Sequence, residues 1–194
     1  MEMKYNIEWL LDKYDNGDKL EYIFFWGHQP SKDGSITKSC LSQWWVSPFE
    51  VIGNILDNTV KYKTAEHWMM AQKALLFGDT DTYEKIIYSK TPKEAKVLGR
   101  EVRNFNEDIW ITKRYEIVLK GSLHKFFYDK NLAQYLVSTG DKILVEASPY
   151  DKIWGIGMDV NTIYDIENPN NWKGLNLLGF ALMEARDTLV EYYT

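Results

Sequence analysis

A glutamate at the start of an apolar segment is the residue of this chain best suited to chemistry. Residues 64–77 read Thr-Ala-Glu-His-Trp-Met-Met-Ala-Gln-Lys-Ala-Leu-Leu-Phe, and Thr64 is a good helix N-cap. Glu66 then falls in the first turn, where backbone N–H groups and the helix dipole favour a carboxylate. A helix that is apolar nearly all round is buried, and a buried charge is costly unless it is paired or used. A first-turn glutamate is also common in ordinary helices, so this segment alone leaves a structural role and a catalytic role open.

Other polar residues could complete a site around this acid. Helical spacing puts Lys73 on the same stripe as Glu66, although a lysine can also reach the surface along its apolar stem. Trp154 lies in a loop between residues 148 and 173, and such loops often carry function; the alternative is that it plugs the core beneath the loop. The candidate polar contacts, with the glycine of that loop, are Ser42, Gln72, Lys73, Arg100, Asp151 and Gly155.

Composition narrows the kind of ligand. The chain has 8 Trp, 13 Tyr and 8 Phe among its 194 residues, and so many large aromatic rings suit a protein that stacks a flat ligand. The net charge of −5 disfavours non-specific duplex binding, which depends on Lys and Arg, although a local basic patch could hold a phosphate. The candidate walls for a stacked base are Trp26, Trp44, Trp110 and Trp154.

Several familiar chemistries do not match the sequence. The single cysteine, Cys40, excludes an intramolecular disulfide and a cysteine metal cluster. None of the three histidines has metal-ligand spacing, and there is no Walker A motif or complete dinucleotide-binding glycine motif. We therefore expect no metal and no cofactor. A carboxylate, tryptophan rings and a few cations suit hydrolysis of a nucleoside-like glycosidic bond, whose oxocarbenium-like transition state a fixed carboxylate stabilises.

The elements that must position these residues are mostly helical. Apolar spacing, N-caps and turn residues predict an α+β fold, predominantly helical with a few short strands, in a single domain spanning residues 1–194. Residues 1–20 form an N-terminal helical extension, and the absence of βαβ alternation argues against a Rossmann fold. We expect strands over 22–26, 49–52, 59–62 and 142–147, with Asp57-Asn58 in a hairpin loop, and helices over 6–15, 64–77, 80–89, 92–103, 106–127, 129–137 and 177–189.

The first residues lack the apolar core of a signal peptide, and no apolar run approaches the length of a membrane span. We expect a cytoplasmic protein without a membrane partner.

Short motifs in a fixed order resemble the NADAR (YbiA-like) family, named for a link to NAD and ADP-ribose. The resemblance covers roughly residues 22 to 190. It is carried by Phe25-Trp-Gly-His28, Ser39-Cys-Leu-Ser-Gln-Trp44, Thr64-Ala-Glu-His-Trp68, Ala71-Gln-Lys73, Leu98-Gly-Arg100, Trp110, Asp151-Lys-Ile-Trp-Gly155, Asn176-Leu-Leu-Gly179 and Leu182-Met183.

The resemblance implies an N-glycosidase with a YbiA-like fold and no metal requirement. The family's catalytic glutamate falls on Glu66, and its substrate-lining positions fall on Trp110, Asp151, Trp154 and Gly155. Some members cleave phosphorylated ribosylaminopyrimidine intermediates of riboflavin synthesis. Others remove ADP-ribose from guanine bases of nucleic acid, reversing modification by a toxin-like ADP-ribosyltransferase, which makes such a transferase a candidate partner.

Two departures bear on the substrate. The family often has Ser-Asn-Phe at residues 42–44 and a carboxylate at position 156, where this chain has Gln43 and Ile156; Asp151 or Asp159 could replace the missing acid. The long loop of residues 27–34 and the many tryptophans favour ADP-ribosylated guanine over a ribosylaminopyrimidine phosphate. A reader that binds ADP-ribose or a similar nucleotide without turnover, and a covalent role for Lys32 or Lys38, are alternatives.

Overall fold

The computed structural model describes residues 3–52 and 59–193, which form two compact units. One unit is the continuous segment Gln43–Lys130. The other combines the chain up to Ser42 with the chain from Asn131 onward. The predicted hairpin residues Asp57-Asn58 lie outside the described residues, and the single domain over 1–194 stays a prediction.

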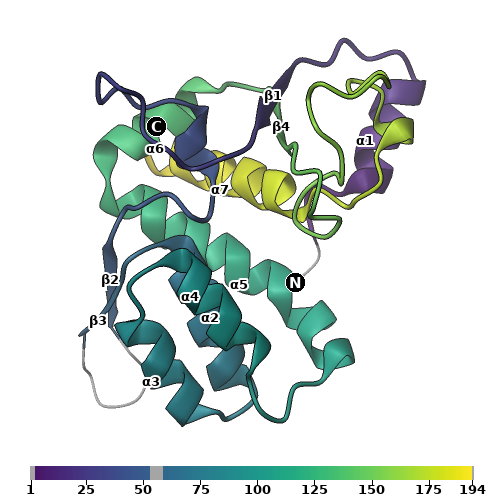
Figure 1. The fold of residues 1–194 in the computed structure, drawn as a ribbon. Helices are drawn as coiled ribbons and strands as arrows, with labels where there is room; N and C mark the ends of the chain where they lie inside the picture. Colours follow the sequence, from purple (N-terminus) through teal and green to yellow (C-terminus); the bar gives the residue numbers. More distant parts are fainter. Residues whose placement is uncertain (1–2, 53–58, 194) are drawn as a thin grey trace. The chain divides into compact units, whose positions relative to one another are not determined.

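In the unit Gln43–Lys130, helix α2 is surrounded by other elements. It packs against α3, α4 and α5 (Figure 1), and strand β3 also contacts it. This burial on several sides explains the apolar sequence of α2, whose residues from Ala65 to Ala71 are all buried. The elements of this unit are β2 (Phe49–Ile52), β3 (Thr59–Tyr62), α2 (Ala65–Leu76), α3 (Thr80–Tyr88), α4 (Pro92–Arg100) and α5 (Glu107–Tyr128).

The other unit is built on a short parallel strand pair. Strand β1 pairs with β4 in the register Tyr22 with Ile143, and α7 packs against β4 (Figure 1). The Asn176 side chain tightens this packing, because it donates to the Leu144 carbonyl and accepts the Glu146 N–H. The elements are α1 (Ile7–Asp15), β1 (Tyr22–Phe25), 3-10 helix η1 (Lys38–Leu41), α6 (Lys130–Ser138, whose first residue ends the other unit), β4 (Ile143–Glu146), 3-10 helix η2 (Pro169–Asn171) and α7 (Leu177–Tyr193).

The predominantly helical α+β fold predicted from the sequence is confirmed. Each predicted helix and strand is present within two residues of its expected limits, apart from two helix ends: α4 stops at Arg100, before the expected Arg103, and the last helix continues to Tyr193. The predicted caps also hold, since Thr64, Thr91 and Asn106 each accept a backbone N–H three residues ahead. No helix in the described part of the chain is long and apolar enough to cross a membrane.

Candidate active site

Glu66 is buried at the beginning of α2. Only 2% of the residue is exposed, and its backbone N–H donates to the Gln43 carbonyl at 3.0 Å. That bond satisfies one of the free N–H groups of the first helical turn and holds residues 43 and 44 beside it. The sequence therefore positions the acid as expected, in a dry environment at the positive end of a helix.

Gln43 adds a buried polar group that was not among the site residues predicted from the sequence. The residue is only 7% exposed, and its side-chain Oε1 accepts no hydrogen bond from any described residue. Buried acceptors without a donor are uncommon in folded proteins. Because the Gln43 backbone is bonded to Glu66, this amide is a candidate acceptor for a substrate hydroxyl or N–H group. The one signal in the sequence was its place next to Trp44, in the family motif.

His67, the neighbour of Glu66, has a structural task. Thr64 Oγ1 accepts the His67 N–H and lies 2.8 Å from Nδ1, while Nε2 lies 3.4 Å from the Ser89 carbonyl oxygen. A carbonyl can only accept, so the proton is assigned to Nε2 and Nδ1 accepts from Thr64. Burial lowers the pKa of His67 from 6.5 to about 4. The ring is therefore neutral at pH 7 and ties α2 to the end of α3.

Lys73 lies on the predicted stripe but is already engaged. Its Nζ donates to the Gly99 carbonyl at 2.8 Å and lies 4.1 Å from the Phe105 ring centroid and 5.5 Å from that of Trp110. Burial lowers the pKa of Lys73, and the nearby Arg100 cation acts in the same direction. The structure thus brings Lys73, Trp110 and Arg100 into one neighbourhood, and their contact with substrate stays a prediction.

Gln72 lies on a different side of α2. It lines a cavity of about 890 Å³ together with Trp68 and residues of β2, β3, α3 and α5, whereas Glu66 does not line that cavity. Its Nε2 donates to the Tyr62 hydroxyl at 3.4 Å. Helical spacing separates Gln72 and Glu66 by about 120° around the axis of α2, so a substrate contact by Gln72 stays a prediction that the cavity does not support.

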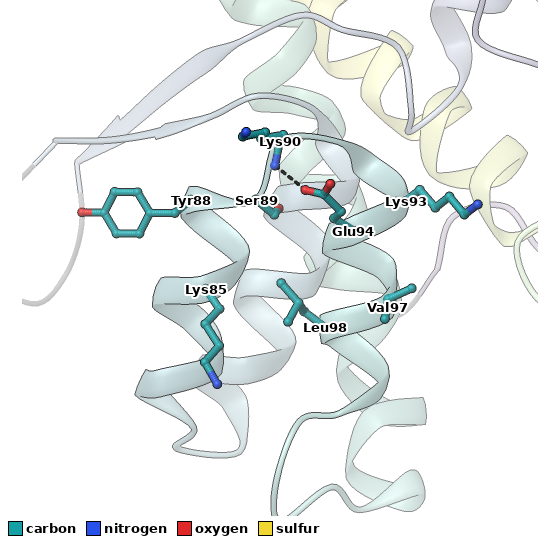
Figure 2. A pocket seen from close by; sticks show the side chains of 8 residues that line it. All are labelled: Lys85, Tyr88, Ser89, Lys90, Lys93, Glu94, Val97 and Leu98. Atoms are coloured by element: carbon teal, nitrogen blue, oxygen red, sulfur yellow. Dashed lines mark hydrogen bonds between the residues drawn. The ribbon is translucent and has the colours of Figure 1, made fainter.

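Trp44, which follows the Gln43 bonded to Glu66, contacts a lysine of α4. It is half-buried, and the Lys96 ammonium lies 5.8 Å from its ring centroid. Lys96 belongs to α4, and α3 and α4 enclose a shallow groove of about 690 Å³ (Figure 2). This groove is lined by Lys85, Tyr88, Ser89, Lys90, Lys93, Glu94, Val97 and Leu98.

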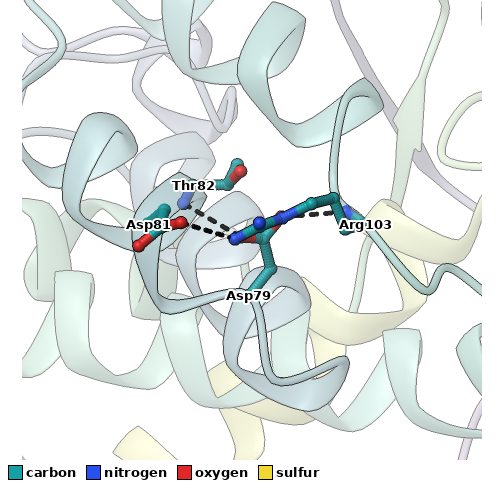
Figure 3. A network of polar contacts seen from close by, with 4 residues as sticks. All are labelled: Asp79, Asp81, Thr82 and Arg103. Carbon is teal, nitrogen blue, oxygen red and sulfur yellow. Dashed lines mark hydrogen bonds and ion pairs between the residues drawn. The ribbon is translucent and has the colours of Figure 1, made fainter.

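A buried carboxylate fixes the opposite end of the same helices. Asp79 caps α3 by accepting the Thr82 N–H, and it binds both the backbone and the guanidinium of Arg103 (Figure 3). The shortest of these contacts is 2.6 Å, and Asp81 also binds Arg103. These hydrogen bonds hold the pKa of Asp79 well below its usual range. Arg103 is thus part of the scaffold.

In the other unit, Asp151 shapes the loop that carries Trp154. Its Oδ1 accepts the N–H groups of Ile153 and Trp154 at 2.9 and 2.8 Å. Gly155 is required by close packing, because a Cβ there would lie 2.7 Å from the Glu146 carbonyl oxygen. Trp154 is half-buried. Asp151 and Gly155 therefore have local structural tasks, and their contact with substrate stays a prediction.

The remaining predicted contacts in that unit differ in exposure. Trp26 is 52% exposed, with Tyr150 at 6.2 Å between ring centroids, whereas Ser42 is 8% exposed. Lys32 and Lys38 are exposed. Asp159 accepts two hydrogen bonds from Asn161, and Ile156 is fully buried. Among the described residues, no cluster of three His, Cys, Asp or Glu side chains could hold a metal ion.

Comparison with known proteins places this arrangement in a family. Residues 24–190 match the model of the NADAR domain. This chain belongs to the NADAR family. The Glu66 motif and the Trp154 loop both lie within the matched range, which agrees with the resemblance inferred from short motifs.

Relatives and a solved structure show the same kinship. The chain is 41% identical over 167 residues to N-glycosidase R617 of Acanthamoeba polyphaga mimivirus, covering 86% of this chain and 95% of the relative. It is 31% identical to riboflavin biosynthesis protein VVA0006 of Vibrio vulnificus, over 68% of this chain and 32% of that protein. The NMR structure of Escherichia coli YbiA superposes with a TM-score of 0.66 at 26% identity, covering 89% of this chain and 87% of YbiA.

Proposed function

We propose that this NADAR protein hydrolyses the N-glycosidic bond that joins ADP-ribose to a guanine base of nucleic acid, with Glu66 as its catalytic carboxylate. The observation that carries the proposal is the burial of Glu66 in the first turn of α2, within the matched NADAR domain. Membership of the family and the N-glycosidase relative support the coarser statement, that the chain is a hydrolase of N-glycosidic bonds. The identity of the base and the sugar is the finer part of the proposal.

The chemistry needs only a carboxylate and water. As the bond between C1′ and the base nitrogen breaks, its electron pair moves to the base and positive charge builds on the ribose ring. The Glu66 carboxylate stabilises that charge and orients a water molecule toward C1′. The water oxygen bonds to C1′, and one of its protons passes to the base. The buried Oε1 of Gln43 is suited to accept a hydrogen bond from a ribose hydroxyl and so to hold the sugar in place.

Three features support a substrate larger than a nucleoside monophosphate. Trp26 exposes 52% of its surface, and Tyr150 is 86% exposed beside it, so this unit presents aromatic surface on which a base could stack. In the loop after Trp26, the Asp33 carboxylate accepts from Ser31 and Ser35, which gives the loop an internal framework. The cations near α4, Lys73 and Arg100, are suited to a pyrophosphate.

The test is direct comparison of two substrates. The full chain is incubated with an oligonucleotide that carries ADP-ribosylated guanine and, separately, with a ribosylaminopyrimidine phosphate, and products are followed by mass spectrometry. Glu66→Gln serves as the inactive control. Release of ADP-ribose from the oligonucleotide supports the proposal, and cleavage of the pyrimidine phosphate alone would contradict it.

A specific observation favours the second substrate class. The Vibrio vulnificus relative is named a riboflavin biosynthesis protein, so cleavage of phosphorylated intermediates of that pathway is the alternative activity. A third reading, an ADP-ribose reader without turnover, would appear in the same assay as nucleotide binding by calorimetry with no cleavage of either substrate and no effect of Glu66→Gln.

A further inference from the structure

Positive charge is concentrated on one segment of an acidic chain. The whole protein carries a net charge of −5, yet residues 85–103 contain six basic and two acidic side chains. The segment covers the end of α3, the turn between α3 and α4, and α4 itself. Its basic residues are Lys85, Lys90, Lys93, Lys96, Arg100 and Arg103.

Three of these lysines surround the groove between α3 and α4 (Figure 2). Lys85, Lys90 and Lys93 are exposed, and none of them forms an ion pair with any carboxylate of the described residues. The acid lining the groove, Glu94, accepts the backbone N–H of Lys90 at 2.7 Å, so it caps α4 and leaves the lysine ammonium groups to other partners. These amines are available to an anion.

The groove is also lined by an exposed aromatic residue. Tyr88 is 80% exposed, and Figure 2 shows its ring projecting away from α3. Exposing a tyrosine to this extent gains nothing for the core. Lysines that follow a phosphate backbone, combined with an aromatic face on which a base stacks, are the combination that proteins use to hold single-stranded nucleic acid.

Hydrogen bonds and a cation–π contact within the unit Gln43–Lys130 connect the two helices of the groove to the beginning of α2. Lys63 donates to the Ser89 and Tyr88 carbonyls, and His67 Nε2 faces the Ser89 carbonyl. On α4, the Lys96 ammonium lies over Trp44, whose neighbour Gln43 is bonded to Glu66. The two helices that form the groove are therefore held against the segment that carries Glu66.

We infer that the groove formed by Lys85, Tyr88, Lys90 and Lys93 binds the single strand of nucleic acid that flanks the modified base. The lysines neutralise its phosphates and Tyr88 stacks a neighbouring base. A single strand fits better than a duplex, because a base must leave the stack before an enzyme can act on it. This inference rests on the proposed function, and it says which surface of the protein binds the nucleic acid strand that carries the modified base.

The test measures binding of an unmodified oligonucleotide, which requires no catalysis. Fluorescence anisotropy of a labelled single strand is recorded over a range of salt concentrations for the full chain and for the triple variant Lys85→Gln, Lys90→Gln, Lys93→Gln. Loss of three phosphate contacts should reduce the slope of log K against log salt by about 2. The matched control, Lys61→Gln with Lys113→Gln and Lys130→Gln, removes the same charge from exposed lysines outside the groove.

The stacking ring is tested in the same way. Tyr88→Ala should weaken binding by about ten-fold, whereas Tyr128→Ala, at a tyrosine that is 56% exposed on α5, should leave it unchanged. Equal binding by the groove variants and their controls would overturn the inference, as would tighter binding of duplex than of single strand.

Cleavage of monomeric ADP-ribosylated guanosine distinguishes the two proposals. The triple variant should cleave this small substrate at the wild-type rate, since the groove holds only the flanking strand. If the wild-type protein cleaves no modified guanine but loses oligonucleotide binding in the triple variant, the proposed activity fails and the groove stands.

Discussion

Replacing Glu66 by Gln should remove activity and leave the fold nearly intact. The two side chains have the same shape, and the backbone bond from residue 66 to the Gln43 carbonyl does not involve the side chain. What the folded state loses is one negative charge in the first turn of α2, which stabilises a helix by about 1 kcal/mol. For a chain of this size, the melting temperature should fall by roughly 2–4 °C.

The effect on catalysis should be far larger. A carboxylate that orients water and stabilises the developing cation typically contributes about 10²–10⁴ in rate, which corresponds to roughly 3–5 kcal/mol of transition-state stabilisation. The loss should appear in kcat, because a neutral amide of the same shape still fits the bound substrate. Both quantities are measured on one preparation, by thermal unfolding and by release of ADP-ribose per folded molecule.

The matched control is Glu8→Gln. Glu8 is also a first-turn glutamate, in α1, but it is exposed and lies outside the matched NADAR range. It should show a similar or smaller change in melting temperature and wild-type activity. If Glu66→Gln instead destabilised the protein by about 3–5 kcal/mol, the loss expected for a buried charge pair, and kept its activity, Glu66 would be structural and the reasoning refuted.

Three further predictions concern the scaffold around the site. Because burial lowers the pKa of His67 from 6.5 to about 4, the unfolded state binds more protons between these pH values. Stability should therefore fall by about 3 kcal/mol as pH drops through this window, and His67→Gln should flatten that part of the profile in urea unfolding at a series of pH values. Gly121→Ala should lower the free energy of unfolding by about 1–3 kcal/mol, as measured in urea, since the new Cβ would lie 2.4 Å from the Trp68 ring. Asp79→Asn should lower the melting temperature at pH 7 by weakening the bonds to Arg103. The lowered pKa of Asp79 means that wild-type stability is lost as pH falls below about 3.8, the ordinary value, so the difference in melting temperature between wild type and variant should narrow steadily as the pH is lowered from that value.

Local chemistry made the helices predictable. Thr91 followed by Pro92 and Glu94 marked the start of α4, and the structure shows the Thr91 hydroxyl accepting the Glu94 N–H. The Glu94 carboxylate, however, accepts from Lys90 and not from Thr91, a detail that depends on how the chain enters the helix. Caps depend on residues three or four positions apart, so a sequence contains the information directly.

Pairing between distant segments was not predictable in the same way. Strand β1 joins β4 across more than a hundred residues, and no local pattern specifies which strand an apolar run will meet. The buried Asn176 shows the consequence. In the sequence it was one residue of a family motif, whereas in the structure its amide bonds to two backbone groups of β4.

In the candidate site, too, local features were predictable and features that depend on packing were not. Helical periodicity placed Glu66 and Lys73 on one stripe and correctly predicted the burial of Glu66. It also separates Gln72 from them, which residue type alone did not reveal, and the cavity lined by Gln72 lies on that other face. The groove between α3 and α4 could have been suspected from the density of lysines in residues 85–96, but its concave shape needed the packing of two helices.

Variants of Lys73 can separate a purely structural role of this side chain from a role in substrate binding. Gly99 is one of the last residues of α4, where carbonyl groups have no partner within the helix, and the Lys73 ammonium supplies that partner at 2.8 Å. Lys73→Met should therefore cost about 1–3 kcal/mol of stability, measured by urea unfolding. An ammonium has two more N–H groups, so if Lys73 also holds a substrate phosphate, the variant should raise KM several-fold with little change in kcat. Lys73→Arg, which keeps the charge, should have a KM between those of Lys73→Met and the wild type. A destabilised variant with wild-type KM would show that Lys73 serves only to cap α4.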